Sequence, residues 1–304
     1  MTSQTAFGSL VFAGVALVAG VFGLDACGGP SSPAPTPTPP PATLAWADEF
    51  DGPANAGPDR TKWTFDLGNN NGWGNHELET YTDAIENAHL DGSGHLVIHV
   101  DRSPSGYTSA RLKTRGLLVA QYGRLEARIK VPSGQGIWPA FWMLGSSFNG
   151  ANWPACGEID VMENIGREPG RVHGTIHGPG YSGGSGVTAS FTLASGGKFA
   201  DDFHTFAIDW QPRSIKFSVD GNQYQAVTPS SIPNGAAWVF DAPFFVLLNV
   251  AVGGDFPGPP DASLVLPQEM LVDYVRYAPA APSALALPAL NRMSSLLRVR
   301  RAGR

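Results

Sequence analysis

The sequence predicts an all-β domain built from two packed antiparallel sheets. Short runs that alternate apolar and polar residues recur along the chain, and turn residues separate them, with 37 glycines and 26 prolines among 304 residues. Only 15% of the residues are charged, and few segments show the period of a long helix. Because 42% of the residues are hydrophobic, the chain can form one large core. Strands at this density indicate two sheets packed face to face.

Four segments show the pattern most clearly. Residues 95–100 are expected to form a strand, and residues 123–131 a second one with apolar side chains at alternate positions. Residues 214–224 predict a hairpin that turns at Asp220-Gly221. Residues 244–252 are almost continuously apolar, which predicts a strand buried on both faces.

Residues 158–163 read Glu-Ile-Asp-Val-Met-Glu and place three carboxylates in a segment that otherwise resembles a buried strand. In a strand, Glu158 and Asp160 share a face, whereas strict alternation sends Glu163 to the opposite one. A β-bulge at Val161-Met162 adds one residue and returns Glu163 to the face of the other two acids. Crowded carboxyl groups have separated pKa values, so such a cluster can supply one acid and one base.

A helix is the alternative for this segment. It would place Glu158 and Glu163 about 140° apart, and Asp160 and Glu163 would then be simple surface charges. The β-branched residues between the acids favour the strand.

The charge balance excludes one class of partner for the main domain. The formal net charge is -6, and residues 279–304 contain five arginines and no acid. The rest of the chain therefore carries 15 basic and 26 acidic residues, a net charge of -11. An acidic domain of this kind is not expected to bind nucleic acid.

The N-terminal region predicts export. Residues 7–24 form an uncharged, largely apolar run within a leader that ends at residue 27. The tetrapeptide Leu24-Asp25-Ala26-Cys27 resembles a lipoprotein cleavage box, which predicts a membrane tether through lipidated Cys27. An uncleaved anchor and release by an ordinary signal peptidase are the alternatives. Residues 28–42 form an extended Pro/Thr-rich linker, residues 43–278 one globular domain, and residues 279–304 a basic tail expected to be disordered.

The second cysteine, Cys156, lies two residues before Glu158. A nucleophilic thiol needs a partner such as histidine, and the sequence supplies no such constellation. A small buried thiol is therefore the expected state of Cys156.

Segments along the whole domain resemble glycoside hydrolase family 16, in its laminarinase-like (endo-β-1,3-glucanase) branch. They occur in the order of that family and include 158–163 together with 48–52 (DEFDG), 72–77 (GWGNHE), 107–114 (YTSARLKT), 122–130 (YGRLEARIK), 134–144 (GQGIWPAFWML), 173–177 (HGTIH), 203–210 (FHTFAIDW), 248–254 (LNVAVGG) and 273–276 (DYVR). The resemblance implies a β-jelly-roll sandwich with a concave substrate cleft. It also implies a monomer that needs no cofactor for catalysis.

The resemblance assigns a role to each acid of the hexapeptide. Glu158 matches the nucleophile, Glu163 the acid/base, and Asp160 the acid between them. Retaining glycosidases use two carboxyl groups about 5–5.5 Å apart and form a covalent glycosyl-enzyme intermediate.

Other residues are expected to bind substrate, and each has a plainer alternative. Aromatic faces stack on sugar rings, although large aromatic residues more often fill cores. His177 is expected to hydrogen-bond the acids or the sugar, because no metal-binding motif surrounds it and His173. For Asn75, Glu77 and Arg111, the alternatives to substrate binding are turn formation and a surface ion pair. The predicted set is Trp73, Asn75, Glu77, Arg111, Trp138, Trp142, Trp153 and His177.

The resemblance further implies a structural calcium ion far from the cleft. Its ligands would be the Asp273 carboxylate and the backbone carbonyls of Glu49 and Gly94, since calcium prefers oxygen ligands.

The sequence therefore predicts an exported endo-hydrolase of β-1,3-glucan or mixed β-1,3/1,4-glucan. Two alternatives stay open. One is a hydrolase or transglycosylase of the same fold that acts on agarose, carrageenan or xyloglucan. The other is a non-catalytic β-glucan-binding lectin, which the three acids disfavour, because fold alone does not fix a function.

Overall fold

The computed structural model describes residues 44–148 and 153–281. In these ranges, helical structure is limited to three short 3-10 turns, at Gly72–Gly74, Gly183–Ser185 and Ala194–Gly196. No helix among the described residues is long and apolar enough to cross a membrane. The predicted leader and linker, Cys27 included, and residues 282–304 of the predicted tail lie outside the described residues.

The first sheet has ten strands: β1 (Trp46–Asp48), β3 (Glu79–Tyr81), β4 (Ala88–Leu90), β5 (Leu96–Ser103), β6 (Gly106–Ser109), β8 (Gly123–Lys130), β13 (His204–Gln211), β14 (Ser214–Val219), β15 (Asn222–Val227) and β17 (Gln268–Ala278). Their order is β15-β14-β13-β8-β17-β5-β6-β3, with β1 against β17 and β4 against β5. The pairs are antiparallel except β3 with β6 at the sheet edge, where the chain crosses over through β4 and β5.

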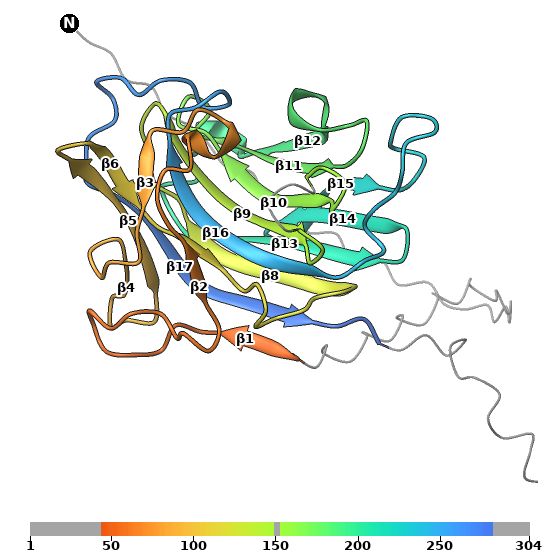
Figure 1. Ribbon diagram of the computed structural model, residues 1–304, viewed down its shortest axis with the longest axis horizontal. Helices are drawn as coiled ribbons and strands as arrows, with labels where there is room; N and C mark the ends of the chain where they lie inside the picture. The colour runs from red at the N-terminus through yellow and green to blue at the C-terminus, as the bar shows by residue number, and fades with distance from the viewer. Residues whose placement is uncertain (1–43, 149–152, 282–304) are drawn as a thin grey trace, which may run out of the picture. The chain divides into compact units, whose positions relative to one another are not determined.

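The second sheet has seven strands: β2 (Thr64–Asp66), β7 (Arg111–Lys113), β9 (Ile137–Gly145), β10 (Glu158–Asn164), β11 (Arg171–His177), β12 (Val187–Thr192) and β16 (Phe244–Val252). Their order is β12-β11-β10-β9-β16-β7-β2, and every pair is antiparallel. The long strands β9, β10 and β16 lie side by side and bend along their length (Figure 1).

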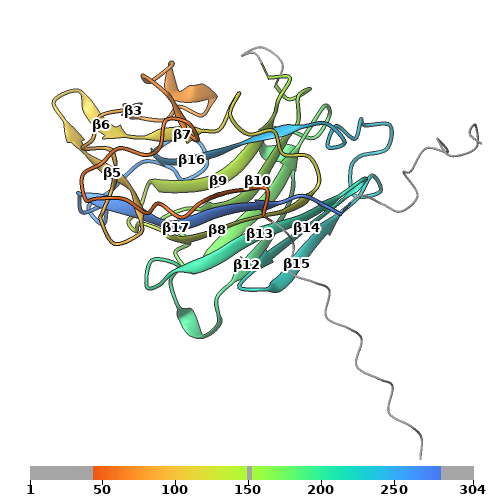
Figure 2. The same ribbon diagram turned by 90° about the horizontal axis from the view of Figure 1, so that it is seen from below.

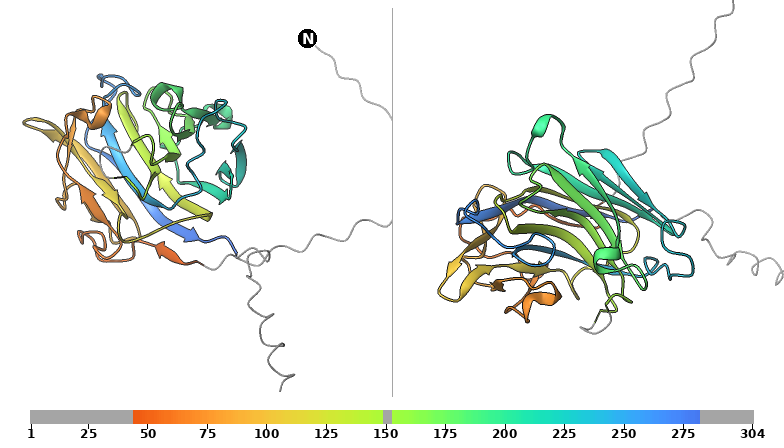
Figure 3. Two further views of the ribbon diagram at one scale, coloured as in Figure 1. Left: turned by 45° about the vertical axis from the view of Figure 1, so that its right-hand side comes forward. Right: turned by 90° about the horizontal axis from the view of Figure 1, so that it is seen from above.

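One continuous core fills the space between the two sheets, which pack face to face (Figure 2; Figure 3). The alternation predicted for residues 123–131 is confirmed, because buried and partly exposed residues alternate along the whole of β8. The hairpin predicted at Asp220-Gly221 is confirmed by the antiparallel pairing of β14 with β15. Every residue of β16 is buried, as predicted for a strand covered on both faces. The architecture is the predicted β-jelly-roll sandwich.

The face of the seven-stranded sheet that points away from this core is called its outer face below. A small apolar cluster packs against Trp142 on this side and consists of Leu144, Cys156, Phe245 and Leu247. Cys156 is buried and unpaired, as predicted, and burial raises the pKa of its thiol. The thiol is therefore part of the packing that supports Trp142.

Candidate active site

Strand β10 contains a β-bulge between Asp160 and Glu163. Toward β9, Asp160 pairs with Trp142 and Met162 with Phe141, so Val161 has no partner of its own. Toward β11, the pairing likewise shifts register between Asp160 and Glu163. The extra residue lies where the spacing of the three acids requires it.

The bulge separates the apolar residues of β10 from its acids. Val161 and Met162 are both buried in the core between the sheets, although they are neighbours in sequence. Glu158, Asp160 and Glu163 lie together on the outer face, close enough that the charges of Asp160 and Glu158 act on Glu163. The predicted convergence of the three carboxyl groups is therefore present in the structure.

Burial is the main influence on the protonation of these acids. It raises the pKa of Glu158 to about 8 and that of Asp160 to about 7, and it raises the pKa of Glu163 well above its ordinary range. The Asp160 charge raises the pKa values of Glu158 and Glu163 further. Glu158 and Asp160 also share a hydrogen bond. The cluster therefore retains protons at neutral pH.

Two tryptophan side chains bind the outer two acids. The indole Nε1 of Trp138 donates to Glu163 Oε1 over 3.1 Å, and that of Trp153 donates to Glu158 Oε2 over 2.5 Å. Trp138 projects from β9, whereas Trp153 belongs to the loop before β10 and is 42% exposed. Each indole lies beside one acid, and both were predicted to bind substrate.

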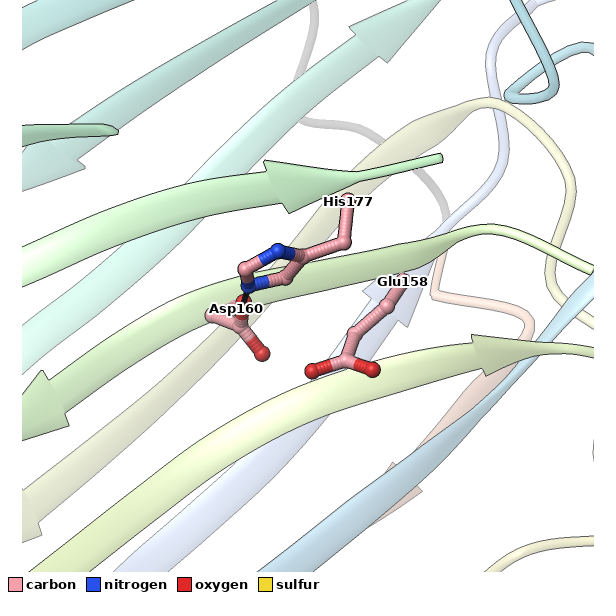
Figure 4. A group of neighbouring side chains, drawn as sticks. All are labelled: Glu158, Asp160 and His177. Carbon is pink, nitrogen blue, oxygen red and sulfur yellow. Dashed lines mark ion pairs between the residues drawn. The ribbon is translucent and has the colours of Figure 1, made fainter. Parts of the chain in front are cut away.

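His177, the last residue of β11, lies beside the inner acid. Its Nε2 is 3.1 Å from Oδ2 of Asp160, and its side chain converges with those of Glu158 and Asp160 (Figure 4). His173, on the same strand, instead contacts Glu168 over 3.2 Å. The two histidines therefore do not share one site.

Phe256 extends the aromatic surface around Trp138. Its ring lies edge-on to Trp138, with centroids 5.6 Å apart, and to His173 at 5.3 Å. Phe256 was not among the residues predicted to bind substrate. An aromatic residue in a Gly/Pro-rich loop after a continuously apolar run was the available signal.

Arg111 lies between two of the predicted aromatic residues. Its guanidinium carbon is 4.6 Å from the centroid of the Trp73 ring and 4.7 Å from that of Trp142. Its Nε also forms an ion pair of 3.1 Å with Asp66. A cation held between two rings fixes both indoles on the outer face.

Glu77 and Asn75 form part of a buried network. Asn75 donates to Glu77 Oε1 over 3.0 Å and Tyr81 donates to Oε2 over 3.1 Å, so both oxygens of Glu77 have partners within the protein. Asn249 connects this network to the aromatic wall, because it donates to the Tyr81 hydroxyl over 2.9 Å and accepts from Trp142 Nε1 over 2.7 Å.

Glu79 completes the network and was missed in the sequence. It is fully buried, its Oε2 accepts the backbone N–H of Val252 over 2.7 Å, and it hydrogen-bonds Glu77. Burial and the neighbouring Glu77 charge raise its pKa well above the ordinary value, which favours the protonated form of Glu79. The available signal was the spacing of Glu77, Glu79 and Tyr81, which stand at alternate positions as Glu158 and Asp160 do.

The predicted calcium ligands belong to the ten-stranded sheet and its adjoining loops. Asp273 on β17 forms an ion pair of 2.6 Å with Arg128. The Glu49 side chain pairs with Arg276 over 2.7 Å. Gly94 precedes β5 and has a positive φ of 89°. An ion bound there would have to share the Asp273 carboxylate with Arg128.

The site holds carboxyl groups with raised pKa values on one face of a β-sandwich, and indoles flank them. Such groups supply the acid and the nucleophile that glycosidic bond cleavage requires. Fold and site together define the class of the protein as a glycoside hydrolase.

Comparisons with known proteins agree with this class. The family model described as "Glycosyl hydrolases family 16" matches residues 75–262. A beta-glucanase from Rhodothermus marinus is 42% identical over 247 residues, which cover 77% of this chain and 84% of that protein. An endo-beta-1,3-glucanase structure from Pyrococcus furiosus is 47% identical with a TM-score of 0.73, covering 79% of this chain and 96% of that one. The laminarinase catalytic domain of Thermotoga maritima is 43% identical, also with a TM-score of 0.73, covering 79% and 99%. This chain belongs to glycosyl hydrolases family 16.

Proposed function

We propose that the protein is a retaining endo-hydrolase of β-1,3-glucan or of mixed β-1,3/1,4-glucan. The observation that carries the proposal is the bulge of β10, which brings Glu158, Asp160 and Glu163 to one face beside Trp138. The names of the relatives, beta-glucanase and endo-beta-1,3-glucanase, support the substrate class.

In the first step, Glu163 donates its proton to the glycosidic oxygen while the Glu158 carboxylate attacks the anomeric carbon. The leaving chain departs as an alcohol, and a glycosyl ester forms on Glu158. In the second step, Glu163 removes a proton from a water molecule that attacks the same carbon, which frees Glu158. Burial and the charge of Asp160 favour the protonated form of Glu163 that the first step needs.

Substrate binding follows from the residues around the acids. Four indoles present ring faces and edges to sugar rings, those of Trp73, Trp138, Trp142 and Trp153. Arg111 holds the indoles of Trp73 and Trp142 in place. His177 positions Asp160. Glu77 acts indirectly, because it holds the Asn75 amide that reaches a sugar hydroxyl.

A substrate panel tests the proposal. Purified protein is assayed on laminarin, lichenan, agarose, carrageenan and xyloglucan, with product length and linkage analysed. Internal cleavage of laminarin or lichenan, with the β-configuration of the new reducing ends shown by NMR at early times, is expected. Cleavage of the other polymers alone contradicts the substrate assignment, transfer products without free reducing ends indicate a transglycosylase, and binding without cleavage indicates a lectin.

The nucleophile is tested separately. A 2-deoxy-2-fluoro glycoside should label the peptide that contains Glu158, because the fluorine slows hydrolysis of the ester. Glu158→Gln should lose both labelling and hydrolysis. Normal activity of this variant would refute the assignment.

The proposal includes export through residues 1–27 and a membrane tether at lipidated Cys27, with residues 28–42 as the spacer of a monomeric enzyme. Cys27→Ser is expected to move the protein from the membrane fraction to the soluble fraction of producing cells. An unchanged distribution contradicts the tether.

The proposal also includes a structural calcium ion at Asp273 and the carbonyls of Glu49 and Gly94, with no role in the reaction. Calcium is expected to raise the melting temperature relative to EDTA, and Asp273→Asn to abolish that difference. Equal melting temperatures with calcium and EDTA argue against the ion.

A further inference from the structure

The catalytic cluster has the composition of a transition-metal site. Nε2 of His177 and one carboxylate oxygen each from Glu158 and Asp160 all lie within 4.8 Å of one another. Figure 4 shows the three side chains converging from the ends of two adjacent strands, β10 and β11. Among the described residues, this is the only such group of three or more potential ligands.

A second observation points to a ligand. Asp160 is 3% exposed, and its Oδ2 has no hydrogen-bond partner among the described residues. This oxygen lies 3.1 Å from His177 Nε2, but the contact does not have hydrogen-bond geometry. Buried polar atoms without partners are rare and need an explanation.

The distance of 3.1 Å between Asp160 Oδ2 and His177 Nε2 matches the distance between two neighbouring ligand atoms of one metal ion. Zinc binds nitrogen and oxygen at about 2.0–2.1 Å, so adjacent donors of a tetrahedron lie about 3.3 Å apart. The third ligand, Glu158, is partly exposed, which leaves the position open to the outer face. Its Oε2 accepts the Trp153 hydrogen bond, and one oxygen of its carboxyl group is directed toward Asp160 (Figure 4).

We propose that Glu158, Asp160 and His177 bind a divalent transition metal ion of the zinc class, which inhibits the enzyme. One imidazole and two carboxylates suit zinc, whereas calcium and magnesium require six or more oxygen ligands. The bound ion occupies the nucleophile and excludes the polysaccharide. The inhibitory half rests on the proposed function, whereas metal binding itself does not.

The chain supplies a matched control in the ten-stranded sheet. His99 also contacts one aspartate and one glutamate, with Nδ1 3.1 Å from Glu269 and Nε2 4.0 Å from Asp101. Because its two nitrogens face different acids, His99 does not gather three ligands around one point. Substitution of His99 therefore measures nonspecific zinc binding by a histidine that also has one aspartate and one glutamate beside it.

The experiment is calorimetric titration of the full chain with zinc chloride in the absence of polysaccharide, and with calcium chloride in parallel. We expect one zinc per chain at the site, and at least a tenfold weaker affinity in His177→Gln and in Asp160→Asn, since even second-shell changes cost 10–100-fold. His99→Gln should bind as the wild type does. Circular dichroism establishes that each variant is folded.

Several results would overturn the site. They are no zinc binding, equal affinity in folded His177→Gln and Asp160→Asn, or calcium binding that depends on His177 as strongly as zinc binding does. Zinc should also inhibit hydrolysis competitively with glucan. Zinc binding without inhibition removes the inhibitory half, and zinc binding by a chain that cleaves no glucan refutes the proposed function while the metal site stands.

Discussion

The indole Nε1 of Trp138 donates a hydrogen bond of 3.1 Å to Oε1 of Glu163, from β9 to the neighbouring strand β10. Glu163 reaches this indole only because the bulge has turned it to the outer face. A hydrogen bond to a carboxylate favours its charged form, so Trp138 opposes the burial that raises the pKa of Glu163. Trp138 on the neighbouring strand thus limits how tightly Glu163 holds its proton.

Trp138→Phe removes this donor and keeps an aromatic ring. The pKa of Glu163 should rise further, and the basic limb of the kcat/KM profile should move to higher pH. We also expect kcat/KM at neutral pH to fall by roughly 10–100-fold, because a hydrogen bond to a charged group contributes about 1.5–3 kcal/mol. A basic limb that stays in place or moves to lower pH contradicts this role of Trp138.

Asp160→Asn should move the acidic limb of the profile in the opposite direction. The nucleophile must be ionised, and burial followed by the Asp160 charge raises the pKa of Glu158 to about 8, so activity increases with pH through that range. Without the charge, the pKa of Glu158 falls and the acidic limb moves to lower pH, while kcat decreases. Asp209→Asn, at an exposed ion pair with Arg124, is the control that should leave the profile unchanged.

Deletion of Val161 should restore strict alternation in β10 and still keep Glu163 on the outer face, because Glu158, Asp160 and Glu163 then occupy alternate positions. Loss of a general acid alone lowers the rate by roughly 10²–10⁴-fold, and the folded deletion variant should lose less than that. Val161→Ala keeps the register and is expected to cost about 1–3 kcal/mol of stability with little loss of kcat. A loss of kcat in the folded deletion variant as large as that of Glu163→Gln would contradict this account of the bulge.

Glu79→Gln and Glu79→Ala should differ sharply in stability. Glutamine can still accept from the Val252 N–H and donate to Glu77, whereas alanine leaves a buried donor unpaired, which costs about 1–3 kcal/mol. Denaturant unfolding measures both effects.

The pH dependence of unfolding tests the protonation of Glu79. A folded-state pKa above the unfolded one contributes stability that is complete below the unfolded value and lost as pH rises through the folded value. Glu79→Gln lacks this loss, so its stability relative to the wild type should increase as pH rises above the ordinary range of glutamate. A constant difference between the two proteins would indicate that Glu79 is not protonated.

Local patterns predicted most of the fold and the centre of the site. Alternation predicted β8, continuous apolarity predicted β16, and the odd spacing of the acids predicted the bulge at Val161-Met162. These features depend on the period of a strand, which is a property of neighbouring residues. The network around Glu77 was not predictable, because Tyr81 of β3 donates to Glu77 and Asn249 of β16 joins the network through Tyr81.

The sequence by itself determined which three acids share a face, since backbone geometry and one extra residue decide that. Only the tertiary structure decided how each acid behaves. Burial raises all three pKa values, the indoles of Trp138 and Trp153 bind the outer two, and His177 arrives beside Asp160 from the next strand. Desolvation and hydrogen bonding depend on everything that surrounds a group in space, and residues distant in sequence supply much of those surroundings.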